Sequence, residues 1–155
     1  MIIITEYLNT LLSEGFKKGA FDVRQVSPLL LAYVGDTVCD LYVRTYLLTQ
    51  EQSNAHRLHM RSIAYVCSRA QSSACFQLLD QFSEEELYIY KRGRNSHPST
   101  IPKNADITEY RTATGLEAVL GYLYLSGQNE RLDMLMQRLL NTQAGGNNAQ
   151  SSTKG

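Results

Sequence analysis

The sequence predicts an all-α protein, and three observations support this prediction. Apolar residues recur at intervals of three and four along several segments, the spacing of one buried helical face. No segment alternates apolar and polar residues with the period of two that is typical of a half-buried strand. Ser27–Pro28 and the serine-glutamate run at Ser83 are typical helix starts. We therefore expect a helical bundle.

The composition indicates an ordinary globular protein. The chain has 155 residues, of which 43% are hydrophobic and 19% charged, and this length suits one hydrophobic core. It contains no apolar run of about 18 residues, so we expect no membrane span, and its start does not look like a signal peptide. Cys39, Cys67 and Cys75 show no CxxC spacing, so we expect reduced thiols in the cytoplasm. A net charge of zero argues against nucleic-acid binding by overall charge, but it is compatible with a local basic surface.

The first half of the chain is expected to contain a short and a long helix. The short helix covers Ile4–Leu12, and a linker over Phe16–Val26 leads to the long helix at Ser27–Leu48. Gly35 lies inside the long helix, although glycine is about 1 kcal/mol less favourable there than alanine. We therefore expect another backbone or a ligand to come close to Gly35.

The middle of the chain predicts two more helical segments and a loop. The first covers Asn54–Leu79, with a break near Ser62. Ser83 and the glutamates after it form a capping box, and the helix that they start is expected to end at Tyr90. A polar loop over residues 91–104 follows, and a loop of this length is often functional.

The last part of the chain predicts two helices and a tail. Thr108–Leu125 is expected to be a helix that Ser126–Gly127 terminates, and Glu130–Leu140 to be an amphipathic helix. After these, the chain is rich in Gly, Asn, Gln, Ser and Thr. We therefore expect one domain over residues 1–141 and a disordered polar tail over 142–155.

Three carboxylates interrupt the apolar pattern. Asp36 and Asp40 lie one helical turn apart in the long helix, and Glu117 lies among small and apolar residues of a later helix. A buried carboxylate is costly unless it is paired or binds a metal. Three hard oxygen donors in one cleft suit Mg²⁺ or Mn²⁺. The alternative is an ion pair, with Arg44 or Arg111 as the partner.

Two segments are rich in basic residues, and each is a candidate phosphate-facing surface. Ordinary solvated surfaces are the alternative for both. The residues are His56, Arg57, His59, Arg61 and Arg69 in the first segment, and Lys91, Arg92, Arg94 and Lys103 in the second.

Several motifs occur in one order along the chain. They are Leu31–Val38 with Leu41–Arg44, Arg69–Gln71, Arg92–Asn95, Pro102–Asp106, Tyr110–Arg111 and Thr114–Tyr124. In these motifs the chain resembles the ribonuclease III catalytic domain, and more closely the Mini-ribonuclease III group, which lacks the double-stranded-RNA-binding domain. The resemblance covers roughly Val26–Leu140.

The resemblance implies a cytoplasmic, homodimeric, Mg²⁺-dependent endoribonuclease that cleaves double-stranded RNA and matures the ends of the 23S ribosomal RNA precursor. A large-subunit ribosomal protein is a candidate assisting partner. Asp36 and Glu117 would be catalytic and would ligate the metal, for which Mn²⁺ is a substitute, and Asp40 is a further candidate ligand. The residues expected to bind RNA are Lys91, Arg92, Arg94, Asn95, Lys103, His56, Arg57 and Arg61.

Two positions depart from full-length ribonuclease III. That enzyme carries a glutamate at the position of Ala32 and an aspartate at the position of Thr114. The losses fit the smaller group, but they leave the number of metal ligands open. They also favour the alternative of a non-catalytic protein on the same fold that binds double-stranded RNA or the ribosome. A helical phosphohydrolase of another family is disfavoured, because the chain has no His-Asp dipeptide.

Overall fold

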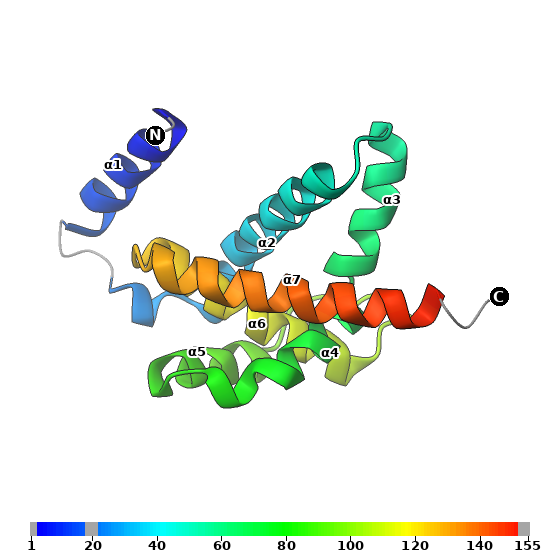
Figure 1. The fold of residues 1–155 in the computed structure, drawn as a ribbon. Helices are drawn as coiled ribbons and strands as arrows, with labels where there is room; N and C mark the ends of the chain where they lie inside the picture. The colour runs from blue at the N-terminus through cyan, green and yellow to red at the C-terminus, as the bar shows by residue number, and fades with distance from the viewer. Residues whose placement is uncertain (1–2, 18–21, 152–155) are drawn as a thin grey trace.

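The computed structural model describes residues 3–17 and 22–151, and all regular structure in these residues is helical (Figure 1). The predicted all-α fold is confirmed. The elements are α1 (Ile3–Lys17), η1 (Val23–Gln25), α2 (Pro28–Gln50), α3 (Ala55–Val66), α4 (Ser68–Leu78), η2 (Leu79–Gln81), α5 (Glu84–Arg94), α6 (Ile107–Leu125) and α7 (Asn129–Ser151). Within the described ranges, no helix has both the length and the apolar character needed to cross a membrane.

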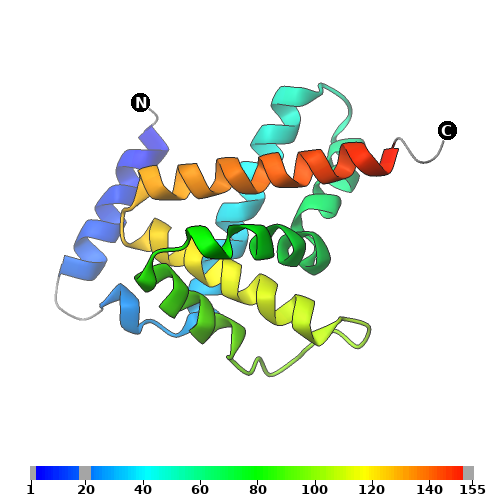
Figure 2. The ribbon, with the colours of Figure 1, turned by 60° about the horizontal axis from the view of Figure 1, so that its bottom comes forward.

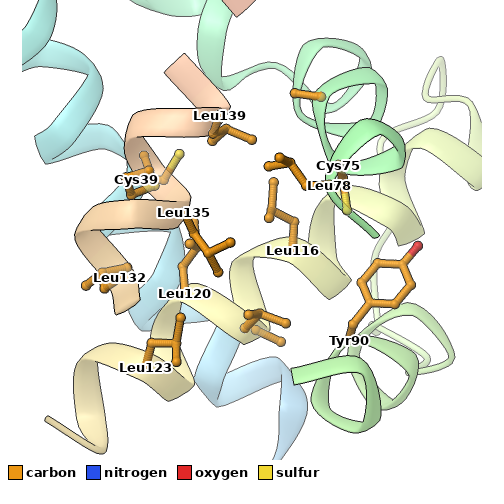
Figure 3. Close-up of a cluster of buried hydrophobic side chains, with 14 of the residues drawn as sticks. Cys39, Cys75, Leu78, Tyr90, Leu116, Leu120, Leu123, Leu132, Leu135 and Leu139 are labelled. Carbon is orange, nitrogen blue, oxygen red and sulfur yellow. The ribbon is translucent and has the colours of Figure 1, made fainter. Parts of the chain in front are cut away.

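Helix α6 is the centre of the bundle. It packs against α2, α4, α5 and α7, and most of its side chains are buried. Figure 2 shows α6 running beside α5 and α4, with α2 behind it. In the close-up of Figure 3, Leu116, Leu120 and Leu123 of α6 lie in one cluster with leucines of α7 and α4. Any side chain on α6 is therefore held by several neighbouring helices.

Two glycines allow α2 and α6 to cross at backbone contact. A Cβ atom at Gly35 would lie 1.7 Å from the carbonyl oxygen of Glu117, and one at Gly121 would lie 1.9 Å from that of Leu31. Neither position has room for any side chain. The expectation that another backbone approaches Gly35 is confirmed.

The break in the predicted Asn54–Leu79 helix lies at Cys67 and not near Ser62. Cys67 has an extended backbone, with φ −66° and ψ 151°, and it ends α3 and precedes α4. Ser62 remains helical and buried, and its hydroxyl has a partner because it donates to the carbonyl oxygen of His59 at 2.7 Å. At the start of α3, Asn54 is the N-cap and accepts a hydrogen bond from the backbone N–H of Arg57.

Helix α5 extends beyond the predicted end at Tyr90 and terminates at Arg94. Its N-terminus carries the predicted capping box between Ser83 and Glu86. Three acidic residues occupy its first turn and three basic residues its last turn, and both placements complement the helix dipole. The first part of the expected loop is therefore helical.

The predicted disordered tail is wrong for residues 142–151, because α7 continues to Ser151. Gln143 shows why part of this segment is ordered: it is buried, and its Nε2 donates to the carbonyl oxygen of Tyr65 at 2.8 Å. A polar composition hid this contact, which joins segments far apart in the sequence. Residues 152–155 of the expected tail, and residues 18–21 of the expected linker, lie outside the described ranges.

Candidate active site

The close crossing of α2 and α6 brings Asp36 and Glu117 together. Asp36 follows Gly35 in α2, and the backbone of Glu117 is what Gly35 contacts. The side chain of Asp36 is exposed, whereas that of Glu117 is half-buried. The crossing therefore produces a carboxylate pair with one member facing solvent and the other set into the protein.

Glu117, the inner carboxylate of the pair, lies in surroundings that disfavour its ionisation. The pKa of Glu117 is raised to about 8, mainly because the carboxyl is buried and also because the charge of Asp36 is nearby. A hydrogen bond from the side chain of Gln71 acts in the opposite direction and favours the ionised form. A bound cation would relieve both costs, because it would neutralise charge at the site.

Asp40 takes a different position from the other two carboxylates. Its Oδ2 lies 2.7 Å from Nε of Arg44, one turn further along α2. The described ranges contain no group of three or more His, Cys, Asp or Glu residues that could hold a metal ion. The expected cleft with three donors is therefore absent within the described chain. Asp40 forms the ion pair with Arg44 that was the alternative, and its role as a metal ligand stays a prediction. Arg111, the other candidate partner, forms no salt bridge among the described residues.

The predicted basic surface on α3 is partly neutralised. Glu51, the residue after α2, lies 2.8 Å from Nε of Arg57 through its Oε1 and also pairs with Arg61. His56 is exposed. This pairing was missed in the sequence analysis because Glu51 lies before α3, outside the helix that carries the basic residues.

At the end of α5, Arg92 is used within the fold. It donates hydrogen bonds to the carbonyl oxygens of Arg24 and Val26, the latter at 3.4 Å. Its guanidinium also lies 5.6 Å from the ring centroid of Tyr88. Arg92 therefore anchors the segment before α2, in addition to carrying charge at the surface.

The other predicted residues of this segment lie at the end of α5 and in the loop after it. Lys91 and Lys103 are exposed, the former in the last turn of α5 and the latter in the loop. Arg94 lies 5.6 Å from the ring centroid of Tyr90 and donates from Nε to Oδ1 of Asn95 at 3.2 Å. Lys91 and Lys103 are thus the most available cations of this group.

Two buried residues behind the carboxylate pair were not predicted as part of the site. Gln71 of α4 donates from Nε2 to Sγ of Cys39 of α2 at 3.7 Å. Burial, followed by the charge of Glu117, raises the pKa of Cys39 to about 12, so this thiol stays protonated and is no nucleophile. The sequence signals for Gln71 were its place in the Arg69–Gln71 motif and its polar side chain among the apolar positions of the helix, and neither assigned it a role.

Comparison with known proteins adds independent information on this site. The sequence pattern of the family described as "Ribonuclease III domain" matches residues 29–128, a range that includes both carboxylates. A curated relative named Mini-ribonuclease 3 from Clostridium tetani is 41% identical over 131 residues, which are 84% of this chain and 85% of the relative. Another of that name, from Enterococcus faecalis, is 44% identical over 74% of this chain and 89% of the relative.

A solved structure supports the fold. A crystal structure of a protein from Fusobacterium nucleatum superposes with a TM-score of 0.71 at 31% sequence identity. The match covers 79% of this chain and 98% of that protein. The similarity therefore extends over most of the chain.

Proposed function

The chain belongs to the ribonuclease III domain family and is an endoribonuclease of that type, and on this basis we propose that it cleaves double-stranded RNA with Asp36 and Glu117 as its catalytic residues. The observation that carries the proposal is the carboxylate pair at the crossing of α2 and α6. Packing alone does not explain it, because two neighbouring carboxylates, one of them half-buried, cost stability unless they serve a cation or a proton.

The residues present fit a divalent metal ion, for which we propose Mg²⁺, with Mn²⁺ as a substitute. Mg²⁺ is commonly bound through one or two carboxylates, with water and substrate phosphate as the other ligands. Asp36 and Glu117 would hold it, and a cation would offset the burial and the charge of Asp36 that raise the pKa of Glu117. Asp40 as a further donor, directly or through water, stays a prediction, and it would compete with the Asp40–Arg44 ion pair.

When bound, the cation would polarise the scissile phosphate and supply an activated water for hydrolysis. The exposed Asp36 carboxylate is the part of the pair that meets an incoming duplex first. Glu117 is restrained by the backbone contact at Gly35, so its Cα position is fixed before RNA binds. The protein therefore contributes a preformed pair of acceptors on two rigid helices.

We propose that the enzyme acts as a homodimer, because one site cannot cut both strands of a duplex. A two-fold axis would supply a second site for the opposite strand. Large apolar side chains lie exposed along α2, the helix that carries Asp36, and a second copy of the chain would cover them. They are Leu30, Tyr33, Leu41 and Leu48, with exposed fractions of 58, 76, 66 and 53%.

Duplex RNA would be recognised by shape. A-form RNA exposes phosphates and 2′-hydroxyls, while its deep major groove is closed to side chains. The proposed contacts are the residues at the end of α5 and in the loop after it, with the α3 residues as a second surface. They are Lys91, Arg92, Arg94, Asn95 and Lys103, and His56, Arg57 and Arg61.

The biological substrate that we propose is the paired ends of the 23S ribosomal RNA precursor, processed in the cytoplasm. The resemblance to the Mini-ribonuclease III group supports this proposal, and relatives named Mini-ribonuclease 3 agree with that group. A large-subunit ribosomal protein is proposed as an assisting partner, because the described chain has few free cations with which to hold a duplex.

One alternative has specific support. Ala32 and Thr114 are buried where full-length ribonuclease III carries acids, and the hydroxyl of Thr114 donates to the carbonyl oxygen of Tyr110. These residues would suit a non-catalytic protein that binds duplex RNA or the ribosome. The carboxylate pair favours the enzyme.

The test is cleavage of a long end-labelled RNA duplex in Mg²⁺ at low salt. We expect the wild type to cut, and Asp36→Asn and Glu117→Gln to bind the duplex without cutting it. Asp80→Asn, a change at an exposed carboxylate in η2, is the matched control and should cut normally. Each variant is checked for folding and dimerisation. If the wild type binds duplex but cuts it in neither Mg²⁺ nor Mn²⁺, the binding-protein alternative replaces this proposal.

A further inference from the structure

Gln71 of α4 is a buried polar residue next to the active site. Its exposed fraction is 1%, and it lies on the side of α4 that faces the core, with Ala74 and Cys75. A polar side chain this deeply buried is costly unless its hydrogen-bonding groups have partners. The partners of Gln71 therefore indicate why a glutamine stands there.

The partners of Gln71 belong to the two helices that carry the catalytic carboxylates. Its Nε2 lies 3.7 Å from Sγ of Cys39, which follows Asp36 by three residues and so lies about one turn along α2. The side-chain amide of Gln71 also acts on the Glu117 carboxylate of α6 as a hydrogen-bond donor, which favours the ionised form and lowers the pKa of this carboxyl. One amide group thus joins α2 and α6 from behind the carboxylate pair.

The two bonds differ in strength and in effect. A thiol sulfur is a weak acceptor, whereas a carboxylate accepts a charge-assisted and stronger hydrogen bond. The backbone contact with Gly35 restrains the Cα atom of Glu117, but it leaves the torsions of the side chain free. A donor on a third helix can restrict these torsions, because α4 itself packs against α6.

We propose that Gln71 is a positioning residue, whose amide holds the Glu117 carboxylate in the orientation that faces Asp36 and the bound cation. The inference rests on the proposed function. Partners that orient a metal ligand are typically worth about 10- to 100-fold in metal affinity or activity. A purely structural role, in which Gln71 only fills the space between three helices, makes a different prediction.

The test compares Gln71→Met with Gln143→Met. Methionine has a similar volume to glutamine but cannot donate a hydrogen bond. Gln143 is the matched control, because it is also buried and donates from Nε2, but to the backbone carbonyl of Tyr65. We expect Gln71→Met to lower kcat on duplex RNA by about 10- to 100-fold, with KM within about twofold of wild type. Gln143→Met should leave both constants within about twofold.

Metal binding without RNA gives a second readout. Calorimetric titration with Mg²⁺ should show at least about tenfold weaker binding for Gln71→Met and unchanged binding for Gln143→Met. Wild-type kcat and Mg²⁺ affinity in a folded Gln71→Met variant would overturn the proposal. Equal losses in the two variants would also overturn it, because they would indicate a general effect of removing a buried amide.

A measurement on the unaltered protein covers the case in which Gln71→Met fails to fold. In ¹H–¹⁵N spectra, the side-chain amide signals of Gln71 should shift when Mg²⁺ is added, and those of Gln143 should not. Absence of a shift at Gln71, while the backbone signal of Asp36 responds, would refute the positioning role. If the wild type cuts no duplex, the proposed function fails, and the Mg²⁺ titrations alone decide the role of Gln71.

Discussion

Gly35 and Gly121 lie at the crossing of α2 and α6, and each is in contact with the backbone of the opposite helix. The nearest atoms to their missing Cβ positions are the carbonyl oxygens of Glu117 and Leu31. Both the stability of the bundle and the placement of the Asp36–Glu117 pair depend on this contact.

We predict that Gly35→Ala and Gly121→Ala each destabilise the protein by at least about 3 kcal/mol, because rigid backbone must move to admit a methyl group. Gly15→Ala is the control, since a Cβ there meets nothing within 4 Å. It lies in α1, so alanine should be neutral or stabilising by up to about 1 kcal/mol. Urea denaturation checks all three. A small loss at both crossing glycines would contradict the close contact.

The pKa of Glu117 predicts a pH dependence of stability in metal-free protein. Burial, and then the charge of Asp36, raise this pKa from 4.5 to about 8, so the folded state keeps a proton that the unfolded state loses. The free energy of unfolding should therefore fall as the pH rises from about 4.5 to 8. Glu117→Gln should remove this fall and should be more stable than wild type at pH 8.

The measurement is urea denaturation in EDTA across this pH range, with Asp80→Asn as the control that retains the wild-type slope. Parallel pH profiles for wild type and Glu117→Gln would refute the assignment. Adding Mg²⁺ at pH 8 should stabilise wild type more than Glu117→Gln, because binding to the folded state raises its stability.

The Glu86–Arg131 pair makes the opposite pH prediction. Burial acts to raise the pKa of Glu86, but hydrogen bonds from Arg131 and from the backbone N–H of Ser83, with the charge of Arg131, outweigh it and leave the pKa below its usual value. This contribution to stability is complete above pH 4.5, and it is lost as the pH falls through the lowered pKa. In acid denaturation, Glu86→Gln should lack the loss of stability that wild type shows as the pH falls through this pKa.

Arg131→Met should cost about 3 kcal/mol, because it leaves a carboxylate with only 4% of its side chain exposed without its partner. Arg24→Met, at an exposed ion pair with Asp22, is the control and should change stability little. Thermal unfolding at pH 7 compares them. Equal effects would contradict the difference in burial.

RNA affinity should distinguish free cations from paired ones. Lys91→Gln and Lys103→Gln should each weaken duplex binding and reduce the slope of log K against log salt by about 0.9. Glu51→Gln should strengthen binding at low salt, because it releases Arg57 and Arg61. Fluorescence anisotropy with Ca²⁺ in place of Mg²⁺ checks binding without cleavage. Weaker binding by Glu51→Gln would exclude α3 as an RNA-facing surface.

Much of the fold was accessible from sequence, because apolar spacing and caps are local signals. The spacing in α2 and α6 predicted both helices, and the small residues within them predicted their close approach. The motifs at Asp36 and Glu117 then indicated the family. These features depend on residues that are neighbours along one helix, so no long-range contact was needed to recognise them.

What the sequence did not reveal depends on contacts between distant segments. The pairing of Arg57 with Glu51 joins the end of one helix to the next, and the bond from Gln143 to Tyr65 joins α7 to α3. Gln71 connects α4 to both helices of the site. Each partner has an ordinary local context, so only the folded arrangement identifies it.

The enclosure of α6 by four other helices also determines how the site fluctuates. Backbone amides in a segment buried on all sides exchange with deuterium mainly when the whole domain opens, whereas those of peripheral helices exchange through local fraying. The amide of Glu117 should therefore be among the slowest to exchange, and those of α1 among the fastest. Local motion at the edges of the bundle, where RNA and partners would bind, would leave the position of the inner carboxylate unchanged.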